Sequence, residues 1–335
     1  MAFAVHRWRW LPAFAFASML VPAGLAFAGP ATETADARAW LARIQSAAQT
    51  RNYQGTMVYS AGGLLSSSRI AHFSVDSQTY ERLESLDGRQ RRVFRVNDTV
   101  HTVWPQTRVA VIEKRGPTMA LPSNTQAVEP RALDQYELRS EGTDRIAGRD
   151  AQVLLLKPRD ELRYAQRLWA DKATGLMLRA DVIGSDRNVL ESVAFSEVDI
   201  GVKANPDAVV QGVRKLEGFK VLRPQLQPVA LDAEGWAIER GVPGFTLVTC
   251  VKRPLEAGDG PATGPVLQAV FSDGLTHVSL FIEPHDPARR FDDLVGQVGA
   301  TSTLRQRRGD HWLTLMGDVP AATLRQFADA LDRRR

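Results

Sequence analysis

The stretch from Asn52 to Gly63 reads NYQGTMVYSAGG and leads on to ERLESLDG at Glu81 to Gly88. Two sets of side chains alternate along its first half, which is the period of a β-strand. These sets are Tyr53, Gly55, Met57 and Tyr59 on one side and Gln54, Thr56, Val58 and Ser60 on the other. The stretch therefore predicts an early strand, and none of its residues forms a catalytic motif.

The segments on either side extend this prediction. A helix is expected between Ala35 and Arg51, because apolar residues recur there on one helical face. That face consists of Trp40, Ile44, Ala47 and Ala48. Short β-prone runs from Tyr53 to Val111 are separated by turn signals such as Asp87-Gly88, a pattern typical of antiparallel hairpins. We expect a helix followed by an antiparallel meander.

A long interruption lies between Lys114 and Pro130, where Gly and Pro residues surround the apolar residues Met119 and Leu121. A loop of this length is either a lid or a solvated detour. Strands are predicted again from Asp144 to Val198. One helix covers only part of so long a sheet, so we predict a curved, half-open barrel with room inside.

Periodicity weakens between Lys203 and Gly235, which indicates a linker. Strand patterns return in Phe245–Lys252, Val266–Ser272, Leu275–Glu283 and Trp312–Gly317, and a helix is predicted after Pro320. The expected fold is α+β and mainly antiparallel β, with a smaller C-terminal domain of antiparallel strands and a terminal helix. The expected segments are a signal peptide at 1–28, domains at 29–203 and 236–335, and a linker at 204–235.

The first residues have the three parts of a secretory signal. Arg7 and Arg9 precede an apolar run, which ends in Ala26-Phe27-Ala28. Cleavage after Ala28 and a periplasmic location are expected, and a membrane anchor is the alternative reading. The chain has 42 Lys and Arg against 38 Asp and Glu, and cleavage would bring this ratio closer to balance. Such a balance does not indicate nucleic-acid binding.

The sequence contains no constellation that predicts catalysis. Cys250 is the single cysteine, so an internal disulfide is excluded and a buried thiol is expected. The histidines lack metal-ligand spacing, although His277, Glu283, His285 and Asp310 are candidates to converge. Nucleophile elbows and phosphate-binding loops are missing as well. We expect no catalytic residue, metal or cofactor, which favours binding over enzymatic activity.

Several longer stretches carry a resemblance to a known family. They are NYQGTMVY at Asn52–Tyr59, ERLESLDG at Glu81–Gly88, DRIAGRDA at Asp144–Ala151, RYAQRLWAD at Arg163–Asp171, TGLMLRADV at Thr174–Val182, VFSDGLTHVSLFIEP at Val270–Pro284 and GDHWLTLMGDVP at Gly309–Pro320. In this order they resemble the RseB/MucB family over nearly the whole chain after residue 28.

The resemblance implies a periplasmic negative regulator of an envelope-stress sigma factor, such as sigma-E or AlgU, and not an enzyme. Such a protein binds the periplasmic domain of a membrane anti-sigma factor, of the RseA or MucA type, and shields it from proteolysis. The implied N-terminal domain is an open barrel like those of LolA and LolB. The implied signal is a lipid or lipopolysaccharide that displaces the anti-sigma factor, and a homo-oligomer is left open.

Two sets of residues are candidates for these contacts. The lipid-binding candidates on expected strands are Met57, Tyr59, Phe73, Leu83, Trp104, Trp169, Met177 and Leu178, with Met119 and Leu121 as a lid. The partner-binding candidates are Arg163 and Arg167, expected on a strand surface, together with Trp236, Phe245 and Phe281. For each apolar candidate on a strand, an ordinary position in the core is the more common role. A lipid or lipoprotein carrier is the alternative function, and a periplasmic hydrolase is a third.

Overall fold

The computed structural model describes residues 30–114, 128–214, 216–254, 265–287 and 292–334. The expected signal peptide, with its cleavage site, lies outside these residues, as do Met119 and Leu121. Within the described ranges, no helix has the length and apolar character that crossing a bilayer requires.

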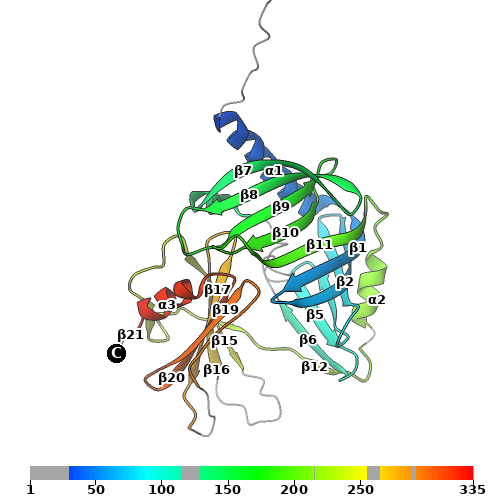
Figure 1. Cartoon of the computed structure of the whole chain (residues 1–335). Helices are drawn as coiled ribbons and strands as arrows, with labels where there is room; N and C mark the ends of the chain where they lie inside the picture. The colour runs from blue at the N-terminus through cyan, green and yellow to red at the C-terminus, as the bar shows by residue number, and fades with distance from the viewer. Residues whose placement is uncertain (1–29, 115–127, 215, 255–264, 288–291, 335) are drawn as a thin grey trace, which may run out of the picture.

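A sheet of 12 strands forms the larger part of the fold, in the order β12-β6-β5-β4-β3-β2-β1-β11-β10-β9-β8-β7. Its strands are β1 Tyr53–Ala61, β2 Leu64–Val75, β3 Gln78–Ser85, β4 Arg92–Val96, β5 Thr99–Trp104, β6 Val109–Lys114, β7 Tyr136–Ile146, β8 Arg149–Pro158, β9 Ala165–Asp171, β10 Met177–Ile183, β11 Val189–Ile200 and β12 Lys220–Leu222. Neighbouring strands are antiparallel except β12 and β6, which are parallel. The sheet curves strongly and ends at β12 and β7 (Figure 1), so it is a half-open barrel as predicted.

Helix α1, Pro30–Thr50, packs against β7, β10 and β2. Its residues Ala37, Leu41 and Ile44 join the core of the first sheet, which confirms the predicted N-terminal helix. Helix α2, Pro206–Arg214, packs against β4 and β3. Its buried Val209 belongs to a separate cluster with Phe73 and Phe94. On strand β2, Ile70 belongs to the cluster under α1 and Phe73 to the cluster under α2. Side chains alternate across a strand, so these two positions, three residues apart, point to opposite faces, and the two helices cover opposite faces of the sheet.

A second sheet of seven strands has the order β13-β15-β16-β17-β20-β19-β18. Its strands are β13 Gln227–Pro228, β15 Thr246–Pro254, β16 Pro265–Ser272, β17 His277–Pro284, β18 Leu294–Val298, β19 Thr301–Arg308 and β20 His311–Gly317. Helix α3, Ala321–Ala330, packs on β19 and β20 with Leu324 and Phe327 in the core. The terminal helix is thus confirmed, with Pro320 as its N-cap residue. A small pair, β14 Trp236–Ile238 and β21 Leu331–Arg333, lies beside it.

Residues 204–235, expected to be a linker, carry regular structure at both ends. Helix α2 and strand β12 pack on the first sheet, and β13 pairs with β15 of the second. The sheets are therefore joined by a short segment after Leu222. The proposed domain boundaries stay a prediction. The first domain is the part built on the 12-stranded sheet, and the second domain is the part built on the seven-stranded sheet.

Candidate functional site: the junction between the two domains

The turn between β16 and β17 inserts into the first domain. Leu275 at its tip is 7% exposed and belongs to the core cluster around α1. The Glu129 amide donates to the Gly274 carbonyl at 2.8 Å. Gly274 has φ of +96°, and a Cβ there would lie 2.9 Å from Cγ of Arg131. Only glycine suits both this conformation and this close approach.

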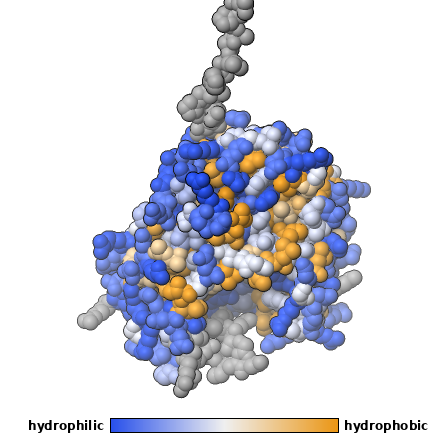
Figure 2. Space-filling view, viewed as in Figure 1, coloured by the Kyte–Doolittle hydropathy of each residue, from blue (hydrophilic) through white to orange (hydrophobic). Residues whose placement is uncertain are grey.

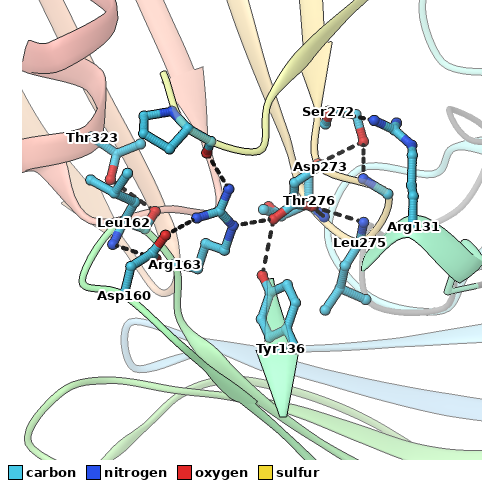
Figure 3. A network of polar contacts seen from close by, with 12 residues as sticks. Arg131, Tyr136, Asp160, Leu162, Arg163, Ser272, Asp273, Leu275, Thr276 and Thr323 are labelled. Atoms are coloured by element: carbon cyan, nitrogen blue, oxygen red, sulfur yellow. Dashed lines mark hydrogen bonds and ion pairs between the residues drawn. The ribbon is translucent and has the colours of Figure 1, made fainter. Parts of the chain in front are cut away.

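Asp273, which begins this turn, accepts hydrogen bonds from both domains (Figure 3). Its Oδ1 accepts from the amides of Leu275 and Thr276 at 2.9 and 2.8 Å. Its Oδ2 accepts from Nε of Arg163 at 2.6 Å and from the Tyr136 hydroxyl at 3.2 Å. Asp273 is 1% exposed. A charge buried so deeply is tolerated because these four donors satisfy its oxygens.

Arg163 holds the first-domain side of this contact, and its side chain is 0% exposed. Besides Asp273 it donates to the Asp160 carboxylate and, at 2.5 Å, to the Pro243 carbonyl. Its guanidinium also lies 4.7 Å from the ring centroid of Phe245. The residue thus contacts the second domain through a carboxylate, a carbonyl and an aromatic ring.

Two further hydrogen-bonded contacts flank the ion pair. Arg131 donates to the Thr246 hydroxyl at 2.7 Å and to the Ser272 carbonyl at 3.0 Å. On the other side, the Thr323 hydroxyl of α3 donates to the Leu162 carbonyl at 2.9 Å. Figure 3 shows Arg131 with Ser272 on one side of the ion pair and Leu162 with Thr323 on the other. The junction is a buried polar network with fixed geometry.

Tyr136 completes the network from the edge strand β7 and is 1% exposed. Burial, followed by the nearby Asp273 charge, raises the pKa of its hydroxyl well above the ordinary range. The hydroxyl therefore remains protonated and acts as a donor to Asp273 across physiological pH.

A second contact joins the domains near the turn between β18 and β19. Gly299 in this turn approaches β1 so closely that a Cβ would lie 2.6 Å from Cβ of Ala61. Glu191 of β11 is 3% exposed and accepts hydrogen bonds from the Tyr59 hydroxyl and the Ala300 amide. Burial first, and the Asp318 carboxyl second, raise the pKa of Glu191 to about 7.

The polar groups of the junction hold two parts of this chain together. The ionisable groups of the junction are engaged in ion pairs and hydrogen bonds between the domains. Among the residues that the structure describes, no cluster of three or more His, Cys, Asp or Glu side chains is arranged to hold a metal. Of the four residues considered for such a site, His285 accepts from the Trp312 indole at 3.1 Å.

The predicted lipid-binding residues divide between core and partly exposed positions. Met57, Trp169 and Leu178 are buried in the cluster under α1, and Tyr59, Leu83 and Met177 pack partly exposed against it. Phe73 lies in the cluster under α2, on the opposite face of the sheet. Trp104, at the end of β5, is partly exposed. The structure thus brings six of the candidates together and separates Phe73 from them.

The predicted partner-binding residues lie at different depths. The expected surface position of Arg163 is wrong, because the residue precedes β9 and is buried against Asp273. Arg167 lies on β9 with its side chain 35% exposed and pairs with Glu141 at 2.6 Å. Trp236 and Phe245 are core residues of the second domain. Phe281 of β17 is only partly buried.

Sequence reasoning missed the acidic residues of both contacts. By its sequence Asp273-Gly274 is an ordinary hairpin-turn signal, and nothing in the sequence singles out Glu191 or Asp318. A single sequence gives no sign that an Asp in a turn is buried against another domain. The one usable signal was Gly274 itself, because glycine after Asp permits a tight turn as well as a close approach.

The two sheets and their buried junction define a mainly antiparallel β protein, with a large half-open sheet and a smaller sheet that is covered by a terminal helix. The family model of the MucB/RseB N-terminal domain matches residues 36–213 of this chain, and the model of the MucB/RseB C-terminal domain matches residues 230–332. The chain belongs to the MucB/RseB family, which confirms the resemblance seen in its sequence.

Individual relatives agree with this membership. The sigma factor AlgU regulatory protein MucB of Pseudomonas aeruginosa is 31% identical over 93% of this chain and 95% of its own. The sigma-E factor regulatory protein RseB of Escherichia coli is 26% identical over 94% of this chain and 96% of its own. The solved MucA/MucB complex of P. aeruginosa has a chain with 28% identity and a TM-score of 0.70, covering 90% of this chain and 99% of that one.

Proposed function

We propose that this chain is a periplasmic regulatory protein that binds the periplasmic domain of a membrane anti-sigma factor. By shielding that domain from proteolysis it would repress an envelope-stress sigma factor. The observation that carries the proposal is the match to MucB over 93% of the chain. Solved relatives in complex with MucA, including its periplasmic part, support the choice of partner. The proposed role is regulatory, without catalysis.

We place the partner on an exposed apolar surface beside the junction. This junction patch consists of Leu64 and Leu65, 67% and 70% exposed, and Val298, 57% exposed. The patch lies where the two domains meet. Gly62, in the turn before β2 of the first domain, is so close to Val298 of β18 in the second domain that a Cβ on Gly62 would lie 3.4 Å from Cγ1 of Val298. Apolar residues gather over the strands of the first sheet on the face shown in Figure 2. A partner that touches both domains would bury this patch.

The patch can be tested by substitution. Burying a leucine contributes about 1.5–3 kcal/mol, so Leu64→Asn with Leu65→Asn should weaken binding of the periplasmic anti-sigma domain at least about tenfold. Val248→Asn is the matched control, because Val248 is 54% exposed on β15 of the second sheet. An unchanged dissociation constant in the double variant would place the partner elsewhere.

A lipid ligand is the second part of the proposal. Tyr59, Leu83 and Met177 present partly exposed apolar surface beside the α1 cluster. Each methylene that a lipid chain buries contributes about 0.8 kcal/mol, so about ten give roughly 8 kcal/mol before binding costs. Releasing a fully bound partner requires a differential affinity of about 5.5 kcal/mol. A lipid with several chains has enough apolar surface both to bind and to release the partner.

Calorimetry separates the regulator from a lipid carrier. The chain without residues 1–28 is titrated with the periplasmic domain of its anti-sigma factor, and the titration is repeated with lipopolysaccharide present. Tight binding that lipid weakens is the expected result. Partner binding that lipid leaves unchanged would reject the lipid sensor and keep the regulator. Lipid binding without partner binding would contradict the regulator and favour the carrier.

A further inference from the structure

A buried carboxyl group, that of Glu191, lies at the second contact between the domains, within reach of the Asp318 charge. Glu191 comes from β11 of the first sheet and is 3% exposed. Asp318 follows β20 of the second sheet and is close enough for its charge to act on Glu191. Neither group takes part in the Arg163 network, so the contact is a separate feature of the junction.

Hydrogen-bond donors from both domains serve these carboxyl groups. Glu191 accepts from the Tyr59 hydroxyl and from the Ala300 amide in the turn between β18 and β19. Asp318 accepts from the Thr301 hydroxyl at 2.5 Å. Tyr164, whose hydroxyl accepts from Gln297 at 3.2 Å, also faces the Asp318 charge. The contact supplies polar partners, but it also brings the buried Glu191 near the charge of the partly exposed Asp318.

Burial disfavours the ionised form of Glu191, and the neighbouring Asp318 charge disfavours it further. Burial first, and the Asp318 charge second, raise the pKa of Glu191 from 4.5 to about 7. If the domains separated at this contact, water would return the pKa to its ordinary value. The docked form therefore binds more protons between these two values, and docking weakens as pH rises through this window.

We propose that Glu191 and Asp318 form a proton-dependent latch between the two domains. The latch is closed when Glu191 carries a proton and hydrogen-bonds within the contact. It loosens when Glu191 is ionised, which frees the turn between β18 and β19 from β1. The latch is a property of the domain contact alone and does not depend on the identity of the partner or lipid.

Hydrogen exchange in the full chain tests the latch. Protection of residues 299–302, corrected for the intrinsic pH dependence of exchange, is measured from pH 5 to pH 8. Each unit of pKa difference changes the docking equilibrium about tenfold. We therefore expect protection to fall by at least about tenfold in the wild type. Glu191→Gln keeps the shape of the closed form without a titrating proton, so its protection should not change with pH.

Two further variants make the test decisive. Asp199→Asn removes an exposed carboxyl from the same strand and should retain the wild-type pH dependence. Asp318→Asn removes the facing charge and should reduce that dependence. The latch would be overturned if protection in the wild type did not change with pH. It would also be overturned if protection in Glu191→Gln changed with pH as much as in the wild type. Should Glu191→Gln fail to fold, an unchanged slope in Asp318→Asn would overturn it equally.

Discussion

Replacing Arg163 by methionine should destabilise the protein more than any surface ion-pair substitution. Methionine keeps most of the side-chain volume but removes the guanidinium, which leaves the Asp273 carboxylate unpaired at 0% side-chain exposure. Breaking a buried pair in this way costs about 3–5 kcal/mol. The Pro243 carbonyl, which accepts from Arg163 at 2.5 Å, also loses its donor. The free energy of unfolding in urea measures the loss.

Arg167→Met provides the matched control. Arg167 pairs with Glu141 at the same distance of 2.6 Å, but the two side chains are 35% and 32% exposed. Exposed pairs of this kind contribute about 0–1 kcal/mol. The reasoning is refuted if Arg163→Met costs no more than Arg167→Met. Combining Arg163→Met with Asp273→Asn should recover part of the loss, because no buried charge then remains unpaired.

Two other predictions concern the second domain. Gly244→Ala should lower the free energy of unfolding in urea by more than about 1 kcal/mol. The reason is that φ is +78° and the new Cβ would lie 2.3 Å from Nη2 of Arg163. Gly142→Ala is the control, because φ is +85° but no atom lies within 4 Å of the new Cβ, so its cost should be smaller. Burial first, and the Glu234 charge second, raise the pKa of the Cys250 thiol. Iodoacetamide at pH 8 should therefore alkylate Cys250 slowly in the native chain and rapidly in urea. Equal alkylation rates in the two conditions would contradict the burial of the thiol.

The main elements of the fold follow from local sequence patterns. The alternation in Tyr53–Ala61 became β1, and the apolar face of Ala35–Arg51 became α1 with Ile44 in the core. Asp-Gly pairs marked hairpin turns, because glycine provides the backbone freedom that such turns need. These signals depend on neighbouring residues only, so one sequence is sufficient to detect them.

The missed elements have weak or contradictory local signals. Strand β18, Leu294–Val298, lies at the edge of its sheet with most of its residues exposed, so no buried face produces an alternation. Strand β19 is rich in arginine, and a run of charged residues is typical of solvated surface. Helix α2 begins at Pro206 in a segment whose weak periodicity indicates a linker, although Val209 and Val213 are spaced one turn apart and pack on the sheet. The sheet stabilises that short helix, and this contact is not visible in sequence.

The candidate site was the least predictable part, because its residues meet only after both domains have folded. Arg163 and Asp273 are 110 residues apart in the chain. The strand period placed Arg163 on an exposed surface, whereas the polypeptide bends before β9 and turns the side chain into the junction. Apolar candidates such as Trp236 and Phe245 were correctly recognised as potential core, since hydrophobicity alone favours burial.

The two contacts at the junction have different responses to pH, and this difference determines how the domains can move. Arg163 stays charged at every physiological pH, so its pair with Asp273 and the insertion of Leu275 hold one end of the junction closed. Glu191 and Asp318 hold the other end, where deprotonation favours separation. Opening at one end with the other fixed is a hinge motion. Such a motion would change the shape of the junction patch while leaving both cores intact.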